Sequence, residues 1–232
     1  MVFWTTLPAC VRLARMILET LVVGALQVNC YVLGSGDARL AVVIDPGDNL
    51  RGIQSLLQRH NWSVDRIIAT HGHFDHLLAA RALQEAAGAP FFIHEGDAPL
   101  LAKMQVTSMA WLGYDPGEPP EVTGYLAAGE IIRSGELALE VRATPGHSAG
   151  GVTFVEHAER RAFTGDALFR GSIGRTDLDG DFPTLLESIR SQILTLPDDY
   201  AVLSGHGPAS TVGEERTSNP FLVGSLHHSA GR

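Results

Sequence analysis

A dense run of metal-binding residue types follows directly after an apolar segment that ends at residue 69. Within six positions the run contains His71, His73, Asp75 and His76. Imidazole nitrogens and carboxylate oxygens are protein ligands for zinc, iron and manganese, and the run lacks the cysteines typical of closed structural zinc sites. In a loop, alternate side chains can converge. We therefore expect His71 and His73 to face one metal, and Asp75 and His76 a second one beside it.

Three further candidate ligands occur downstream, each at the end of a predicted strand and beside glycine. They are His147, Asp166 and His206. A single histidine in such a place is more often an ordinary surface or core residue, but the same arrangement recurs three times. Glycine permits tight turns and a close approach of the backbone to a ligand. The pattern therefore predicts that all three side chains join the site.

Apolar runs rich in β-branched residues, bounded by Gly, Asp or Pro, predict the strands that position these loops. These strands are expected at residues 17–23, 30–33, 40–44, 66–70, 91–94, 137–143, 151–155, 161–164 and 201–203. Leu and Ile at helical spacing predict helices around residues 50–57, 77–83 and 185–194. Thr211 and Glu214 form a capping-box pattern, which predicts a last short helix from Val212. Residues 103–129 show no readable pattern.

Composition excludes several classes of protein. The chain has 232 residues and a formal net charge of −9, with no run of basic residues, so nucleic acid is not an expected partner. Its two cysteines exclude a disulfide scaffold and favour a reducing, cytoplasmic location. No signal-peptide pattern or membrane-spanning apolar run is present, so no membrane partner is expected.

One domain is predicted. Residues 1–15 are expected to be an N-terminal extension that is poorly ordered. Residues 223–232, which include His227 and His228, are expected to form a polar C-terminal tail. The domain between them is expected to cover residues 16–222. Its two halves, each of strands and helices, indicate a mixed α/β (α+β) fold.

The metal-binding residues, in this order along the chain, resemble the metallo-β-lactamase fold. Several segments are similar in particular to the short, single-domain glyoxalase II-like hydrolases: residues 29–31, 165–169, 172–177, 205–208, 213–216 and 219–221. The resemblance covers roughly residues 17–222. It implies a four-layer αββα sandwich with the metal centre at the edge between two sheets.

The resemblance also implies a role for each site residue. The first metal would be held by His71, His73 and His147. The second would be held by Asp75, His76 and His206. Asp166 would bridge the two ions, and Asp75 and Asp166 are the residues expected to be catalytic. Asp45, after the strand at 40–44, matches an early Asp that orients ligands through hydrogen bonds, although a strand-ending turn before Pro46 is also a good reading.

Two divalent ions, with zinc favoured over iron or manganese, would supply hydroxide near neutral pH and polarise a carbonyl group. A thiolate departs without a strong general acid, so the chemistry fits a thioester. Glyoxalase II-like enzymes hydrolyse hydroxyacylglutathione thioesters such as S-lactoylglutathione. A glutathione conjugate is therefore the expected small-molecule partner.

Two alternatives remain open. Full-length glyoxalase II proteins carry a C-terminal helical domain that helps to hold glutathione, whereas only about ten residues follow Leu222. The first alternative is therefore a persulfide dioxygenase, because the run at residues 174–177 also occurs in that class of enzyme. These dioxygenases use one iron held by two His and one Asp. The second alternative is a binding or regulatory protein with a vestigial metal site, which the complete ligand set disfavours. A β-lactamase is disfavoured by Asp75 and His76 together with the glyoxalase-like tail.

Arg175 is the expected substrate-binding residue. It lies at the position of a glutathione-contacting Lys in those enzymes, and Asp177 lies at that of a Tyr. We expect the guanidinium group to bind a carboxylate of the glutathione portion. An ion pair between Arg175 and Asp177 or Asp179 is the competing interpretation.

Overall fold

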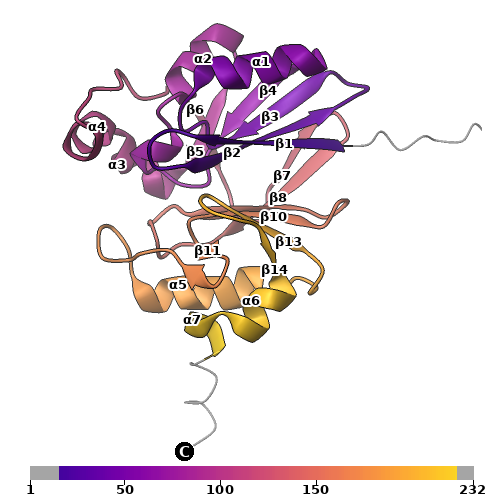
Figure 1. The fold of residues 1–232 in the computed structure, drawn as a ribbon, viewed down its shortest axis with the longest axis vertical. Helices are drawn as coiled ribbons and strands as arrows, with labels where there is room; N and C mark the ends of the chain where they lie inside the picture. The colour runs from indigo at the N-terminus through magenta and orange to yellow at the C-terminus, as the bar shows by residue number, and fades with distance from the viewer. Residues whose placement is uncertain (1–15, 224–232) are drawn as a thin grey trace, which may run out of the picture.

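The structure is a computed structural model that describes residues 16–223 (Figure 1). The extension predicted at residues 1–15 lies outside the described residues, as do Cys10, His227 and His228. The domain boundaries drawn from the sequence therefore stay a prediction.

Two six-stranded sheets form the centre of the molecule. The first sheet has its strands in chain order: β1 (Met16–Val23), β2 (Val28–Ser35), β3 (Leu40–Ile44), β4 (Ser63–Ile68), β5 (Phe91–His94) and β6 (Val122–Leu126). The second sheet has the order β14 (Ser210–Thr211), β13 (Ala201–Ser204), β10 (Arg161–Gly165), β9 (Val152–Glu156), β8 (Leu137–Ala143) and β7 (Ile131–Ser134). A small hairpin joins β11 (Leu168–Phe169) to β12 (Ser172–Ile173).

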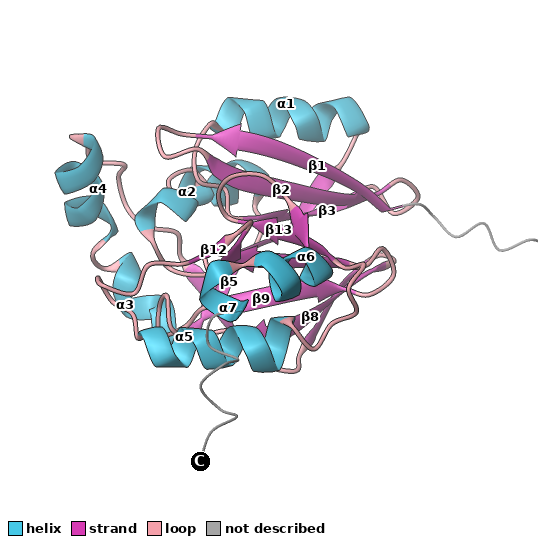
Figure 2. Ribbon diagram, turned by 60° about the horizontal axis from the view of Figure 1, so that its bottom comes forward, coloured by secondary structure: helices cyan, strands magenta, loops and turns pink. Residues whose placement is uncertain are grey.

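Helices cover the outer faces of both sheets, which gives the four-layer αββα order (Figures 1 and 2). Over the first sheet lie α1 (Leu50–His60) and α2 (Ala80–Ala87), and at one end of it α3 (Ala98–Leu101) and α4 (Met104–Leu112). Over the second sheet lie α5 (Phe182–Ser188), α6 (Val212–Ser218) and α7 (Pro220–Val223). The described helices include none that is long and apolar enough to cross a membrane.

Side chains that alternate between the two faces of each strand form three hydrophobic cores. In β3, Ala41 and Val43 pack toward α1 and α2, whereas Val42 and Ile44 pack between the sheets. In the second sheet, Phe163 faces the central core and Ala162 faces α5 and α6. Because successive strand residues point to opposite faces, near-continuous apolar runs are what two-sided burial requires. The αββα fold expected from the sequence is thereby confirmed.

Most predicted elements are present, with shifted ends. The strand predicted at 66–70 is β4, which ends at Ile68, because the Thr70 amide donates to the Asp45 carboxylate instead of continuing the sheet. The helix predicted near Leu77 begins only at Ala80, after a 3₁₀ turn η1 (Phe74–His76). The capping box of α6 is confirmed: the Thr211 side chain accepts from the Glu214 amide, and the Glu214 side chain accepts from the Thr211 amide.

Candidate metal centre

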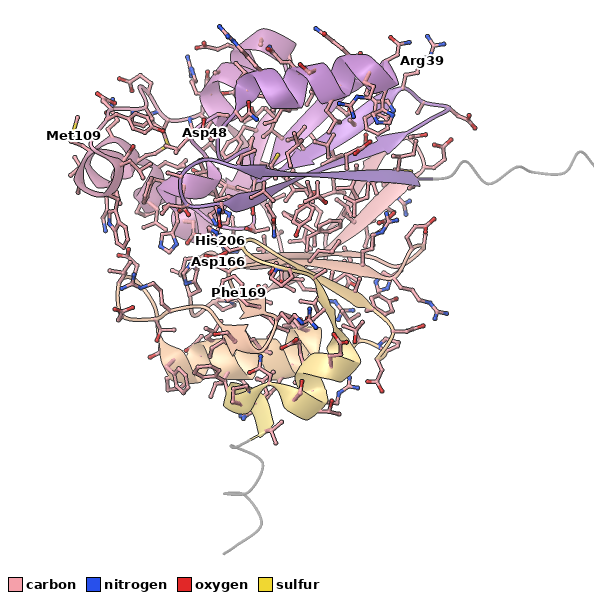
Figure 3. The ribbon with its side chains drawn as sticks, in the orientation of Figure 1. Arg39, Asp48, Met109, Asp166, Phe169 and His206 are labelled. Carbon is pink, nitrogen blue, oxygen red and sulfur yellow. The ribbon has the colours of Figure 1, made fainter. Side chains whose placement is uncertain are left out.

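The predicted ligands come together at one end of the two sheets. Four of them lie on the loop and 3₁₀ turn that follow β4 of the first sheet. The other three follow β8, β10 and β13 of the second sheet: His147, Asp166 and His206. Figure 3 shows Asp166 and His206 close together between the two halves of the molecule, near Phe169. The cluster therefore joins side chains from both sheets.

The first group consists of His71, His73 and His147. One ligand atom from each lies within 4.8 Å of the others. Nδ1 of His73 and Nε2 of His147 are 2.9 Å apart. Nε2 of His71 is buried and makes no hydrogen bond to the described residues. Three convergent imidazoles with an unpartnered nitrogen are a donor set that suits a divalent metal.

The second group consists of Asp75, His76 and His206, again with ligand atoms within 4.8 Å of one another. Nε2 of His76 is 3.3 Å from Nε2 of His206, which in turn lies 3.4 Å from Oδ2 of Asp75. His76 is fully buried, whereas His206 is half-buried. The mixed imidazole and carboxylate set also fits a divalent ion.

Asp166 lies between the two groups. Its Oδ1 is 3.5 Å from Nε2 of His76, and its Oδ2 is 3.6 Å from Nε2 of His147. The same Oδ2 is 3.5 Å from Nε2 of His206. Oδ1 is buried and makes no hydrogen bond to the described residues. A carboxylate that faces both groups at similar distances is placed to serve both.

The outer ring nitrogens of these histidines are held by hydrogen bonds. Nδ1 of His147 lies 2.7 Å from the carbonyl oxygen of Arg175, and Nδ1 of His206 lies 2.9 Å from that of Leu26. Both carbonyls can only accept, so each Nδ1 carries a proton and Nε2 is the ring nitrogen that faces the site. Such outer hydrogen bonds fix the orientation of metal-binding imidazoles. The residues present therefore fit the metals that the sequence predicts.

Asp45 lies where its predicted orienting role requires. Its buried carboxylate accepts from the Thr70 amide at 2.7 Å, from the Thr70 hydroxyl at 2.6 Å and faces Nδ1 of His76 at 3.0 Å. The Thr70 hydroxyl is also 3.1 Å from Nδ1 of His71. Asp45 comes within ligand distance of His71 and His76. Because both of its oxygens already have partners, orienting these imidazoles is the role that its contacts support.

Burial and charge set the protonation of the cluster. Burial, followed by the neighbouring imidazoles, holds the pKa of His71 well below its usual value and lowers the pKa of His73 to about 4. Burial alone would also lower the pKa of His76, but the carboxylates of Asp166 and Asp75 outweigh it and raise that pKa. Burial would raise the pKa of Asp166, yet His76 and its neighbours lower it. His71 and His73 therefore present neutral imidazoles near pH 7.

A cavity of about 340 Å³ opens beside the cluster. The proposed ligands His73, Asp75, His147, Asp166 and His206 form part of its wall. Apolar and cationic side chains form most of the remainder: Leu26, Phe74, Leu100, Lys103, Trp111, Arg175 and Leu178. Cavities of this size hold small organic molecules. Trp111, which the sequence could place only in an unreadable segment, is thus part of the cavity wall.

Arg175 lies at this cavity, in a bidentate ion pair. Its Nε and Nη2 atoms each donate at 2.7 Å to a carboxylate oxygen of Asp177. The guanidinium carbon also lies 5.8 Å from the centre of the Trp111 ring. Both partners of the ion pair are exposed. The pairing that the sequence offered as the competing interpretation is therefore present, at a place where a substrate could also reach Arg175.

Sequence reasoning missed Asp97. This residue ends the 3₁₀ turn η2 (Glu95–Asp97) and is fully buried beside the loops that carry the first histidine group. Its hydrogen-bond partners are Gly72, Ser148 and Gly150. No local pattern marks it, because these partners come from two distant segments. His60 is not one of the candidate ligands; it stacks on Trp62 and contacts Glu19.

Comparison with known proteins identifies the family. The profile of the metallo-beta-lactamase superfamily matches residues 23–206. The chain belongs to this superfamily. Among curated relatives, the hydroxyacylglutathione hydrolase GloC of Haemophilus influenzae is 34% identical over 215 residues, covering 89% of this chain and 98% of GloC. The family resemblance predicted from the motifs is thereby confirmed.

Solved structures of the same superfamily superpose closely. BLEG-1, described as a B3 metallo-beta-lactamase, has 36% sequence identity and a TM-score of 0.81, covering 89% of this chain and 99% of its own. TTHA1623 in a di-iron-bound form has 37% identity and a TM-score of 0.80, covering 88% of this chain and 100% of its own. The superfamily is one of metallo-hydrolases, and the names of its members state different activities.

Proposed function

We propose that this member of the superfamily is a dinuclear metallo-hydrolase that cleaves thioesters, with a hydroxyacylglutathione such as S-lactoylglutathione as its substrate. The observation that carries the proposal is the position of Asp166, which faces both histidine-containing groups beside an open cavity. His71, His73 and His147 would hold one ion, and Asp75, His76 and His206 the other.

Two bound divalent ions would lower the pKa of bound water toward about 7 and polarise the substrate carbonyl. The residues of the chain supply the setting for that chemistry. The buried imidazoles of His71 and His73 remain neutral near pH 7 and so keep their lone pairs. Asp75 and Asp166 provide negative charge beside them. The cavity wall at Trp111 and Arg175 would bind and orient the thiol portion of the substrate.

The thioester assignment is supported by GloC, whose name states that activity and which is matched over 98% of its length. That relative therefore carries its named activity without a large domain beyond the matched region. Zinc is the metal that we favour, because neutral imidazoles and carboxylates suit it. Iron is the first alternative, since TTHA1623 is described in a di-iron-bound form.

The test uses the purified chain loaded separately with zinc and with iron, assayed for release of glutathione from S-lactoylglutathione. We expect hydrolysis that declines toward acid pH as the ligand imidazoles protonate. An Asp166→Ala variant, assayed in parallel, should lose the activity. Oxygen uptake with glutathione persulfide and no thioester cleavage would favour the dioxygenase alternative instead. Metal binding with neither activity would favour the binding-protein alternative.

A β-lactam is the second candidate substrate, because BLEG-1 is described as a B3 metallo-beta-lactamase. The same preparation should therefore be given a chromogenic cephalosporin. We expect thioester hydrolysis to exceed lactam hydrolysis by at least about 100-fold in kcat/KM, a preference worth roughly 3 kcal/mol. A reversed preference would replace the thioesterase assignment with the lactamase one.

A further inference from the structure

Asp97 is a buried carboxylate outside the proposed ligand set. It accepts a hydrogen bond from the Gly72 amide at 2.8 Å, from the Ser148 hydroxyl at 2.7 Å and from the Gly150 amide at 2.5 Å. Its side chain has 0% exposure to solvent. Gly72 and Ser148 directly adjoin histidines of the first group, and Gly150 lies on the same loop as His147.

The donors lie on two loops from different sheets. Gly72 separates His71 from His73 after β4 of the first sheet. Ser148 directly follows His147 after β8 of the second sheet. Asp97 itself follows β5 of the first sheet and bonds to both loops. Its carboxylate therefore connects the two segments whose separation sets the distance between the histidines of the first group.

The backbones around Asp97 are in direct contact. A Cβ atom at Gly72 would approach the Asp97 carbonyl oxygen to 2.8 Å, and one at Gly150 would approach the Asp97 amide nitrogen to 2.5 Å. Neither position has room for a side chain. The loops therefore have little freedom to shift relative to Asp97.

Hydrogen bonds alone compensate the buried carboxylate. Across residues 16–223 the structure gives Asp97 no ion pair, so the three loop donors are what offset its loss of hydration. Moving either loop away would leave the carboxylate poorly satisfied. This coupling holds the loops together before any ion arrives.

We propose that Asp97 is a positioning residue that presets the geometry of His71, His73 and His147 for a metal. The inference rests on the proposed role of these histidines as ligands, but not on the identity of the substrate. Partners that orient ligands from outside typically contribute about 10- to 100-fold to metal affinity. We expect a loss of that size when Asp97 is changed.

The experiment measures zinc affinity of the metal-free full chain by competition with a chromophoric chelator. Asp97→Asn and Asp97→Ala are compared with the parent and with Glu156→Gln. Glu156 is a matched control because its carboxylate is also buried and pairs with Arg161. It lies at the last position of β9, whereas the loop at residues 144–151 precedes the first position of that strand. Thermal unfolding of each metal-free chain separates metal affinity from folding.

We expect Asp97→Asn to weaken zinc binding by about 10- to 100-fold and Asp97→Ala to weaken it further, because Asn keeps one acceptor oxygen. Glu156→Gln should bind zinc like the parent. The visible spectrum of the cobalt(II)-loaded Asp97→Asn protein should also change, since imidazole geometry determines it. Parental zinc affinity and cobalt spectrum in a folded Asp97→Asn protein would overturn the inference.

Ser148→Ala provides a second route if the Asp97 variants do not fold. It removes one of the three donors and leaves the carboxylate in place. We expect it to weaken zinc binding in the same direction by about threefold to tenfold. Unchanged affinity there would overturn the inference. If the variants weaken zinc binding as expected but the parent protein does not hydrolyse thioesters, the inference on Asp97 stands and only the proposed function is overturned.

Discussion

At the scale of single residues, the centre is organised by where each donor atom faces. Asp166 reaches toward His147 of the first group and toward His76 and His206 of the second. Removing Asp166 should therefore affect both proposed metal positions, and removing a peripheral ligand only one.

This difference gives a prediction on metal content. Asp166→Ala should lower the affinity of both positions by more than the roughly 10- to 100-fold typical of an outer partner. His206→Ala should weaken the second position and leave the first occupied. Metal content after dialysis against buffered zinc measures both effects. About one metal per chain at saturation in the parent, unaltered by His206→Ala, would contradict the dinuclear assignment.

Arg175 gives a prediction on substrate binding. Because its partner Asp177 is exposed, a substrate carboxylate can compete for the guanidinium group. Arg175→Ala should lower kcat/KM for S-lactoylglutathione by about 10- to 100-fold, mostly through KM. Steady-state kinetics on a small neutral thioester is the control, and that substrate should be cleaved almost equally by parent and variant. Equal losses on both substrates would assign Arg175 to the fold or the metal centre.

At the scale of elements, close packing at strand ends brings the donors together. Gly205, directly after β13, is the clearest case. A Cβ atom there would lie 2.2 Å from Oδ1 of Asp166 and 2.6 Å from Cε1 of His76. The turn therefore needs glycine to let the second sheet reach the ligands of the first.

A glycine pair tests this packing. Gly205→Ala should lower zinc affinity by at least about 10-fold, because either Asp166 or His76 must move. Gly36→Ala is the control, since a Cβ atom at Gly36 meets nothing within 4 Å. Chelator competition on both variants measures the difference. Parental affinity in Gly205→Ala would show that the ligands tolerate displacement.

The capping box of α6 gives a prediction on stability. Thr211→Ala removes the side-chain oxygen that accepts from the Glu214 amide, and should lower the free energy of unfolding by about 1 kcal/mol. Thr217→Ala, on the exposed side of the same helix, should change it by less than about 0.5 kcal/mol. Urea denaturation of the metal-free proteins would compare them. Equal losses would show that the cap contributes nothing specific.

The limits of prediction also appear at this scale. Strands such as β3 and β8 could be predicted because their apolar runs are bounded by turn residues. Helix α4 could not, because Val106, Met109 and Trp111 are exposed on it, and its apolar residues do not form one stripe. The candidate ligands at residues 71–76 could be predicted from local spacing, and His147, Asp166 and His206 from their repeated places beside glycine after predicted strands. Asp97 was not, since its role depends on two loops that meet only in the folded chain.

At the scale of the whole molecule, Cys30 reports on the integrity of the first sheet. It lies in β2 with 0% exposure, and burial raises the pKa of its thiol far above the usual value. In a Cys10→Ser background it is the only thiol of the chain. Alkylation of this variant should be at least about 1,000-fold slower under native conditions than in denaturant, because the thiol must first be exposed. Rapid native alkylation, measured by mass spectrometry, would reveal local opening of the sheet.

The division of the ligands between two sheets also has a consequence for the newly made chain. The cluster at residues 71–76 is synthesised first, and His206 lies 130 residues after His76. At about 5–20 residues per second, roughly 7 to 26 s separate their appearance. The first group of three is incomplete until His147 has been made, and the second is incomplete until His206 has been made. Full metal capture therefore waits for the second half of the domain, so an ion held by both groups marks a chain whose two sheets have already met.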